Sequence, residues 1–97
     1  MTFQPTVYLL ASKRNGTLYL GVTSNLMQRV IQHRDGTLGG FINKYDVKYL
    51  VWFEQHATIK HPILHEKRIK KWQRRWKIEF IEARNPNWND LFDTIQL

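Results

Sequence analysis

Alternating apolar and polar positions predict a β-hairpin near the start of the chain. Residues 6–12 and 17–22 are rich in β-branched and aromatic side chains, and Asn15-Gly16 lies between them. Asn-Gly is typical of tight hairpin turns because both residues tolerate positive φ. We therefore expect two antiparallel strands joined by a short loop.

The alternation also separates two faces of this hairpin. Positions of one parity are all apolar and should form the core: Val7, Leu9, Ala11, Leu18, Leu20 and Val22. The other face is mostly polar and carries Tyr8 and Tyr19. With a four-residue loop Tyr8 pairs with Gly21, which leaves open space across from the phenol ring. Tyr19 then lies diagonal to Tyr8, about 7–8 Å away on the same face.

The remaining pattern predicts three helices and a third strand. Thr23 or Ser24 can cap a helix that ends at Asp35-Gly36. Its apolar stripe consists of Leu26, Met27, Val30 and Ile31. Residues 37–43 suggest a mobile loop, 47–53 a strand, and 58–72 and 74–83 helices. The break at residues 85–87 predicts that Trp88 folds back onto the body.

Composition limits the class of protein. Ninety-seven residues make one domain at most, here 1–97, and the absence of cysteine excludes disulfides, thiolate zinc sites and cysteine nucleophiles. Fifteen basic against eight acidic residues give a net charge of +7, which indicates an acidic partner, with nucleic acid first and a membrane surface second. Without a membrane span or secretory signal, we expect a cytoplasmic protein.

The densest positive charge lies between residues 67 and 77, where seven of eleven residues are Lys or Arg. If one helix continues through, five of them share a stripe that can follow a phosphate backbone: Lys67, Lys70, Lys71, Arg74 and Arg75. Ile69, Trp72, Trp76 and Phe80 fall on another face and are expected in the core. The alternative interpretation is a solvated face, but no acidic residue interrupts the stripe between residues 67 and 77, which favours phosphate binding.

Three other candidates have both a functional and a structural interpretation. Glu66 borders the apolar stripe of its helix, so it can hold a hard cation or pair with Lys70 one turn away. Arg29 and His33 are four residues apart and can both bind a phosphate. Alternatively, they are two amphipathic side chains at the edge of their helix. The remaining histidines offer no firm ligand spacing and are expected at the surface: His56, His61 and His65.

The order of these residues resembles the GIY-YIG nuclease family, in particular its small stand-alone bacterial members. The likeness rests on Val7-Tyr8-Leu9, on Tyr19-Leu20-Gly21, on the Arg29–His33 pair and on Glu66 in a basic helix. It covers roughly residues 6–88. The resemblance implies an α+β fold, with a small three-stranded antiparallel sheet flanked by helices.

The resemblance also implies metal-dependent hydrolysis of phosphodiester bonds in DNA. Tyr8 and Tyr19 would be the active-site tyrosines, Arg29 the phosphate-facing arginine, His33 its helix partner, and Glu66 the ligand of Mg²⁺, with Mn²⁺ as an alternative. Gly21 and the basic stripe would contact nucleic acid. Val7 and Leu9 depart from the first motif but point into the core. Val22 stands where the family often has lysine.

Several alternatives stay open at this point. Tyr8 is the first choice as general base, but a free phenol has a pKa of about 10, so nearby positive charge must lower it; otherwise His33 or a metal-bound hydroxide serves. The substrate is branched or duplex DNA, with RNA ranked below it, and an unidentified partner can supply targeting. The main rival is a non-catalytic nucleic-acid-binding module. A second rival is an adaptor that exposes Trp72, Trp76 and Trp88.

Overall fold

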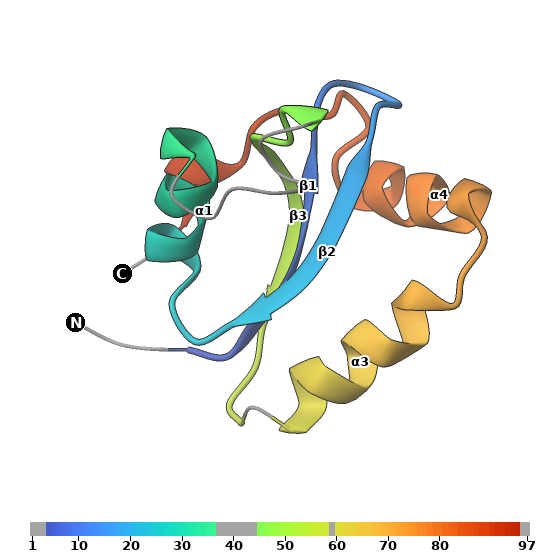
Figure 1. Ribbon diagram of the computed structural model, residues 1–97. Helices are drawn as coiled ribbons and strands as arrows, with labels where there is room; N and C mark the ends of the chain where they lie inside the picture. The colour runs from blue at the N-terminus through green and yellow to red at the C-terminus, as the bar shows by residue number, and fades with distance from the viewer. Residues whose placement is uncertain (1–3, 37–44, 59, 96–97) are drawn as a thin grey trace.

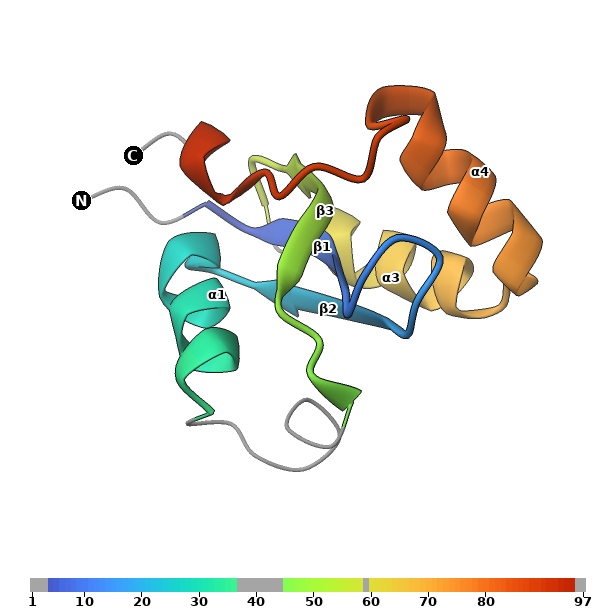
Figure 2. The same cartoon turned by 90° about the horizontal axis from the view of Figure 1, so that it is seen from above.

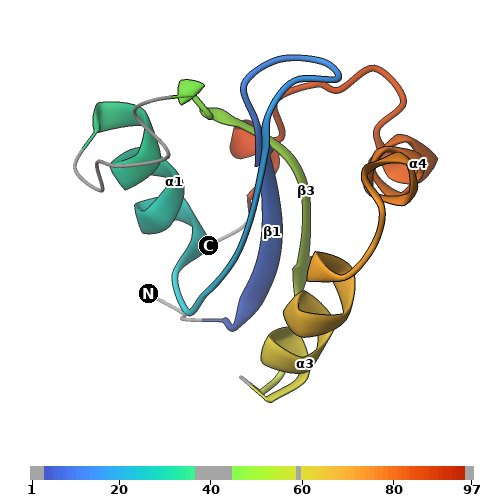
Figure 3. The ribbon, with the colours of Figure 1, turned by 45° about the vertical axis from the view of Figure 1, so that its right-hand side comes forward.

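A three-stranded antiparallel sheet lies between helices on its two faces (Figure 1, Figure 3). The computed structural model describes residues 4–36, 45–58 and 60–95. The strands are β1 (Thr6–Ala11), β2 (Leu18–Thr23) and β3 (Tyr49–Gln55), in the order β2-β1-β3. The expected α+β fold with a three-stranded antiparallel sheet is confirmed. The expected mobile loop at 37–43 lies outside the described residues.

The hairpin has the register expected for a four-residue loop. Tyr8 pairs with Gly21 and Leu10 with Tyr19. The Ser12 N–H donates to the Thr17 carbonyl at 3.0 Å and closes the loop. Asn15 adopts the positive φ of 58° that a tight turn requires. The strands therefore meet in the register that places both tyrosines on one face.

Helix α1 (Leu26–Asp35) covers the face of the sheet that carries these tyrosines. The prediction that only one face of the hairpin belongs to the core is therefore wrong. Tyr8 and Leu10 are fully buried there together with Leu26, Val30 and Leu50. The alternation separates two environments, but both contain buried core residues. On the second face Tyr8 is held by packing, whereas Tyr19 is half-buried.

The opposite face of the sheet is covered by α3 (Lys60–Lys70) and α4 (Arg74–Arg84), as Figure 3 shows. Ile69 of α3 and Ile81 of α4 are fully buried against Val7, Leu9 and Trp52. Figure 2 shows the chain after α4 crossing to the side of α1, where it forms η1 (Phe92–Thr94). The Leu91 N–H donates to the Leu50 carbonyl at 2.7 Å, which fixes this return segment along β3.

The ends of α1 differ slightly from expectation. Asn25 is the N-cap, and its Oδ1 accepts from the Gln28 N–H at 3.2 Å. Thr23 does not cap the helix, because its Oγ1 accepts from the Asn25 N–H at 3.1 Å and shapes the turn before it. Gly36 ends the helix with φ 78°, as its sequence position predicts. Ile31, expected in the apolar stripe, is 47% exposed.

Residues 71–73 separate α3 from α4, in agreement with the two helices predicted at 58–72 and 74–83, so the condition that one helix continues through the basic segment is not met. Lys67 and Lys70 belong to α3, whereas Arg74 and Arg75 begin α4. The five basic residues therefore do not form one helical stripe.

The tryptophans do not form the exposed patch that an adaptor would need. Trp88 is 7% exposed, and its Nε1 donates to Glu82 Oε2 at 2.8 Å. Trp72 is half-buried beside Phe80, with ring centroids 5.1 Å apart. Trp76, expected in the core, is 49% exposed instead. The predicted return of Trp88 onto the body is confirmed.

Candidate active site

Three aromatic side chains from β1, β2 and α1 meet beneath the helix. The ring centroids of Tyr8 and Tyr19 are 6.3 Å apart, and that of His33 lies 5.9 Å from Tyr8 and 5.3 Å from Tyr19. The Tyr8 hydroxyl is 3.2 Å from His33 Nε2, within hydrogen-bond distance. The register of the hairpin and the position of His33 in the last turn of α1 together create this cluster.

Gly21 is the residue that makes room for the Tyr8 phenol. A Cβ at Gly21 would lie 2.6 Å from the Tyr8 Oη and 2.7 Å from its Cζ. The space expected across from the ring is therefore not open, since the ring itself fills it. Gly21 is also buried. In the structure Gly21 therefore admits the phenol, and its contact with nucleic acid stays a prediction.

Burial dominates the acidity of Tyr8. Loss of hydration raises the pKa of the phenol well above its usual value, and the neighbouring Tyr19 raises it further. The charge of Arg29 and a hydrogen bond from its side chain act in the opposite direction but do not offset burial. Tyr8 is therefore a neutral phenol at neutral pH, so Arg29 alone does not lower its pKa as a general base would require.

The charges that act on the pKa of Tyr8 show that two further side chains lie near it. The positive charge of Arg29 acts on the phenol from α1, and the negative charge of Glu66 acts on it from α3. Interactions between charges weaken as the distance between them grows. The structure thus brings Tyr8, Tyr19, Arg29, His33 and Glu66, which are widely separated along the chain, to one locality.

His33 is neutral in this environment. Burial, with Arg29 as the second cause, lowers the pKa of its imidazole to about 4. The residue is 2% exposed, and Nδ1 has no hydrogen-bond partner in the described part of the chain. An uncharged imidazole against a neutral phenol can accept or donate a proton, depending on the tautomer.

Glu66 makes the helix pair expected from its sequence position and also lies partly buried near Tyr8. Its Oε1 lies 2.9 Å from Lys70 Nζ, the pair expected one turn along the helix. Its side chain is nevertheless only 20% exposed, and its charge reaches Tyr8. The second carboxylate oxygen is a suitable ligand for a hard cation such as Mg²⁺, which takes one or two protein carboxylates and completes its shell with water. The donor set at this position therefore fits such an ion.

The basic residues of the predicted stripe differ in whether their side chains are available to bind a phosphate. Lys67, Lys71 and Arg75 are exposed, whereas Lys70 pairs with Glu66. Arg74 donates through Nη2 to the carbonyl oxygens of Asn15 and Gly16 at 2.7 and 2.5 Å. It therefore ties the start of α4 to the hairpin loop.

A second cluster of titratable groups, which the sequence interpretation missed, lies on the other face of the sheet. Glu54, His56 and His65 place one ligand atom each within 4.8 Å of one another. His56 and His65 are half-buried rather than at the surface, whereas His61 is exposed as expected. The available signal was Glu54-x-His56, which places two ligands on one face of a strand.

Comparison with known proteins shows the family to which this chain belongs. The model of the GIY-YIG catalytic domain matches residues 4–79. The chain belongs to the GIY-YIG family. Members of this family are nucleases and are in general metal-dependent, so this chain has a nuclease-type fold and a nucleic acid is its expected class of substrate.

The fold of this GIY-YIG protein is also similar to a structure solved in solution by NMR, the UPF0213 protein BH0048 from Bacillus halodurans. The two chains are 20% identical, with a TM-score of 0.57, and the match covers 90% of this chain and 92% of the other. At this identity the likeness concerns the fold alone. No curated protein matches the chain significantly. No helix among the described residues is long and apolar enough to cross a bilayer.

Proposed function

We propose that this GIY-YIG protein is a Mg²⁺-dependent endonuclease that hydrolyses phosphodiester bonds in DNA, with residues 1–97 forming one nuclease domain. The observation that carries the proposal is the convergence of Arg29 and Glu66, with opposite charges, on the buried Tyr8. Because the described residues hold no separate element for reading bases, we propose selection by DNA structure rather than by sequence. The excess of seven positive charges favours the polyanionic substrate.

Each side chain has a distinct role in the proposed reaction. Arg29 binds the scissile phosphate, because a guanidinium donates two parallel hydrogen bonds and keeps its charge. Glu66 would hold Mg²⁺, and Mn²⁺ could replace it. When bound, such an ion supplies Lewis-acid stabilisation of the charge that develops on the phosphate. Tyr19 orients the phosphate or the attacking water.

Proton transfer follows from the two altered pKa values. Since Tyr8 is a neutral phenol, it acts as a relay: its oxygen accepts the proton of the attacking water while its own proton passes to His33 Nε2, 3.2 Å away. This step requires the tautomer with the proton on Nδ1, which leaves Nε2 free to accept. His33 is then the final base, and its low pKa keeps it unprotonated before the reaction.

The deciding experiment incubates branched and linear DNA with the protein, with and without Mg²⁺. We expect strand scission only with the ion, and we expect Glu66→Gln to abolish it while DNA binding persists. Glu79→Gln is the matched control, because it makes the same change at an exposed position of α4. If the wild type binds DNA but cuts none with Mg²⁺ or Mn²⁺, the protein is the non-catalytic module and the proposal fails.

A further inference from the structure

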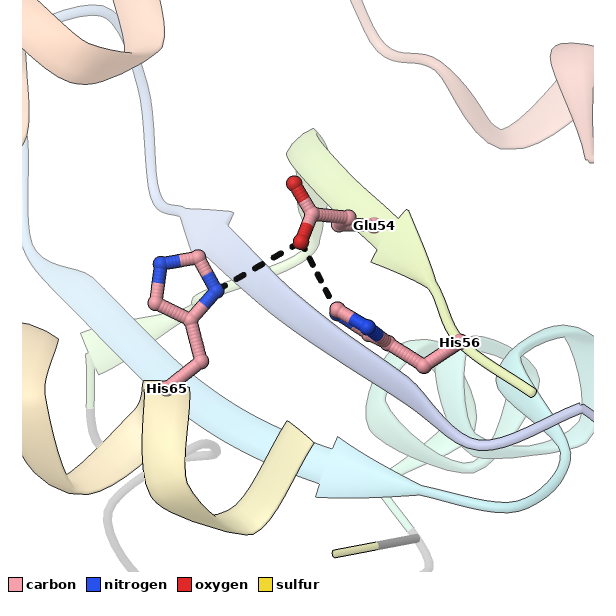
Figure 4. A group of neighbouring side chains, drawn as sticks. All are labelled: Glu54, His56 and His65. Atoms are coloured by element: carbon pink, nitrogen blue, oxygen red, sulfur yellow. Dashed lines mark ion pairs between the residues drawn. The ribbon is translucent and has the colours of Figure 1, made fainter. Parts of the chain in front are cut away.

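Three potential metal ligands converge on the face of the sheet opposite Tyr8, as Figure 4 shows. Glu54 belongs to β3, His56 follows that strand directly, and His65 lies on α3. Glu54 Oε1 is 2.8 Å from His56 Nε2 and 3.5 Å from His65 Nδ1. Glu54 pairs in register with Val7, whose side chain points toward α3 and α4, so this cluster is separate from the candidate active site.

The hydrogen bonding of the cluster is incomplete. His56 Nε2 is buried, yet its short contact with Glu54 lacks hydrogen-bond geometry, and the atom has no hydrogen-bond partner in the parts of the chain that the structure describes. Glu54 Oε2 faces Arg84 Nη2 at 3.8 Å, which leaves Oε1 to both imidazoles. Buried polar atoms without a partner are rare and call for an explanation. A bound cation would satisfy this nitrogen.

The donor set indicates which cation. Two imidazole nitrogens and one carboxylate oxygen suit Zn²⁺, whereas Mg²⁺ prefers oxygen ligands alone. Metal–ligand bonds of about 2.0–2.1 Å in a tetrahedral site place the ligand atoms about 3.3 Å apart. The three atoms here, all within 4.8 Å of one another, reach that separation by small side-chain rotations.

We propose that Glu54, His56 and His65 form a Zn²⁺ site with three protein ligands. The fourth position opens toward a surface pocket of about 210 Å³, lined by His56, His61, Leu64, His65 and Arg68, where a water molecule completes the tetrahedron. Arg84 holds the outer oxygen of Glu54, as outer partners of ligating carboxylates commonly do.

The site would connect α3 to β3, whereas α3 otherwise contacts the sheet mainly through β1 and β2. His65 is part of α3, and Glu54 and His56 lie at the end of β3, so the ion fastens the first half of α3 to the sheet. Zn²⁺ would then stabilise the native state increasingly as its free concentration rises. This inference does not depend on the proposed nuclease reaction.

The test titrates Zn²⁺ into full-length protein from which a chelator has removed bound metal, and calorimetry measures the number of ions bound. Competition with a chromophoric chelator measures the affinity. We expect one ion per chain. Glu54→Gln should weaken binding by more than the roughly 10–100-fold that losing an outer partner costs. Glu66→Gln is the matched control, because it makes the same change one residue beyond His65, and it should bind Zn²⁺ like the wild type. Equal affinities for wild type and Glu54→Gln would overturn the proposal.

A second variant guards against a folding defect in the first. His65→Asn should retain the circular dichroism of the wild type without metal, lose Zn²⁺ binding, and lose the rise in Tm that Zn²⁺ gives the wild type.

With Co²⁺ as probe, the wild type should show the intense visible absorption of a tetrahedral site. No Zn²⁺ bound by the wild type would mean that the cluster is an ion-pair network only. Glu66→Gln separates the two proposals, since it should lose DNA cleavage and keep Zn²⁺.

Discussion

Replacement of Gly21 by alanine tests the packing that places the Tyr8 phenol. The added Cβ would lie 2.6, 2.7 and 3.0 Å from Oη, Cζ and Cε1 of Tyr8. Because the ring is fully buried beneath Leu26, Val30 and His33, it has little room to move away. Gly21 is not among the residues with positive φ, so the backbone itself accepts alanine there. The effect of the substitution is therefore steric.

The size of the effect follows from two opposing terms. Overpacking a filled core costs about 1–3 kcal/mol. Glycine to alanine at a compatible backbone position returns about 0.4–1 kcal/mol, because the unfolded chain loses freedom. We therefore expect Gly21→Ala to lower the free energy of unfolding by about 1–2 kcal/mol. In a domain of this size each kcal/mol corresponds to about 4–8 °C in Tm.

The assay is urea unfolding of a double-mutant cycle. Tyr8→Leu removes all three atoms that the new Cβ would touch, so Gly21→Ala should cost nothing or stabilise the protein in that background. The same destabilisation in both backgrounds would refute the reasoning, because it would show that Gly21 is needed for something other than Tyr8. If the proposed function holds, Gly21→Ala also slows cleavage by displacing the relay hydroxyl.

Three further predictions follow from individual contacts. Asn85→Ala should cost about 2–3 kcal/mol in urea unfolding, because the buried side chain donates to the Val51 and Asn89 carbonyls at 3.1 and 2.9 Å and accepts from the Asn89 N–H; a cost under about 0.5 kcal/mol would contradict this. The lowered pKa of His33, about 4, means that its contribution to stability is complete above pH 6.5 and is lost as the pH falls toward 4, by up to about 3 kcal/mol. His33→Gln should therefore flatten the dependence of unfolding free energy on pH in this window, and parallel curves would exclude the effect. The double variant Lys71→Ala, Arg75→Ala should weaken DNA binding. It should also make the slope of log K against log salt concentration shallower by about 0.9 for each phosphate that the variant no longer neutralises. Lys48→Ala is the control, because Lys48 pairs with Asp46.

The local parts of the fold could be predicted from the sequence because local chemistry determines them. Asn15 and Gly16 set the hairpin turn and hence the pairing of Tyr8 with Gly21. Gly36 ends α1 because it adopts positive φ without strain. By contrast, the second core face escaped prediction. A tyrosine on the polar parity looks exposed, but Leu26 and Val30 of α1 pack in the same buried cluster as Tyr8.

The break between α3 and α4 falls near residue 73, as the two predicted helices require, but its physical cause could not be predicted. Lys71, Trp72 and Gln73 carry no strong helix-breaking signal. Arg74 instead bonds to the carbonyls of Asn15 and Gly16, far away along the chain, and Trp72 packs on Phe80. Such long-range contacts outweigh the small differences in helix propensity. The approach of Glu66 to Tyr8 likewise depends on how α3 docks, which residue spacing alone does not contain.

The position of α3 links the two proposed ion sites. His65 and Glu66 are consecutive in this helix, so their side chains leave its axis about 100° apart. One turns toward Glu54 at the end of β3, and the charge of the other acts on Tyr8. A rotation of α3 that brought His65 closer to Glu54 would therefore move the Glu66 carboxylate away from Tyr8. Because the helix contacts the sheet mainly through β1 and β2, an ion held by His65 would add the missing fixation at β3 and restrict the positions available to the Glu66 carboxylate.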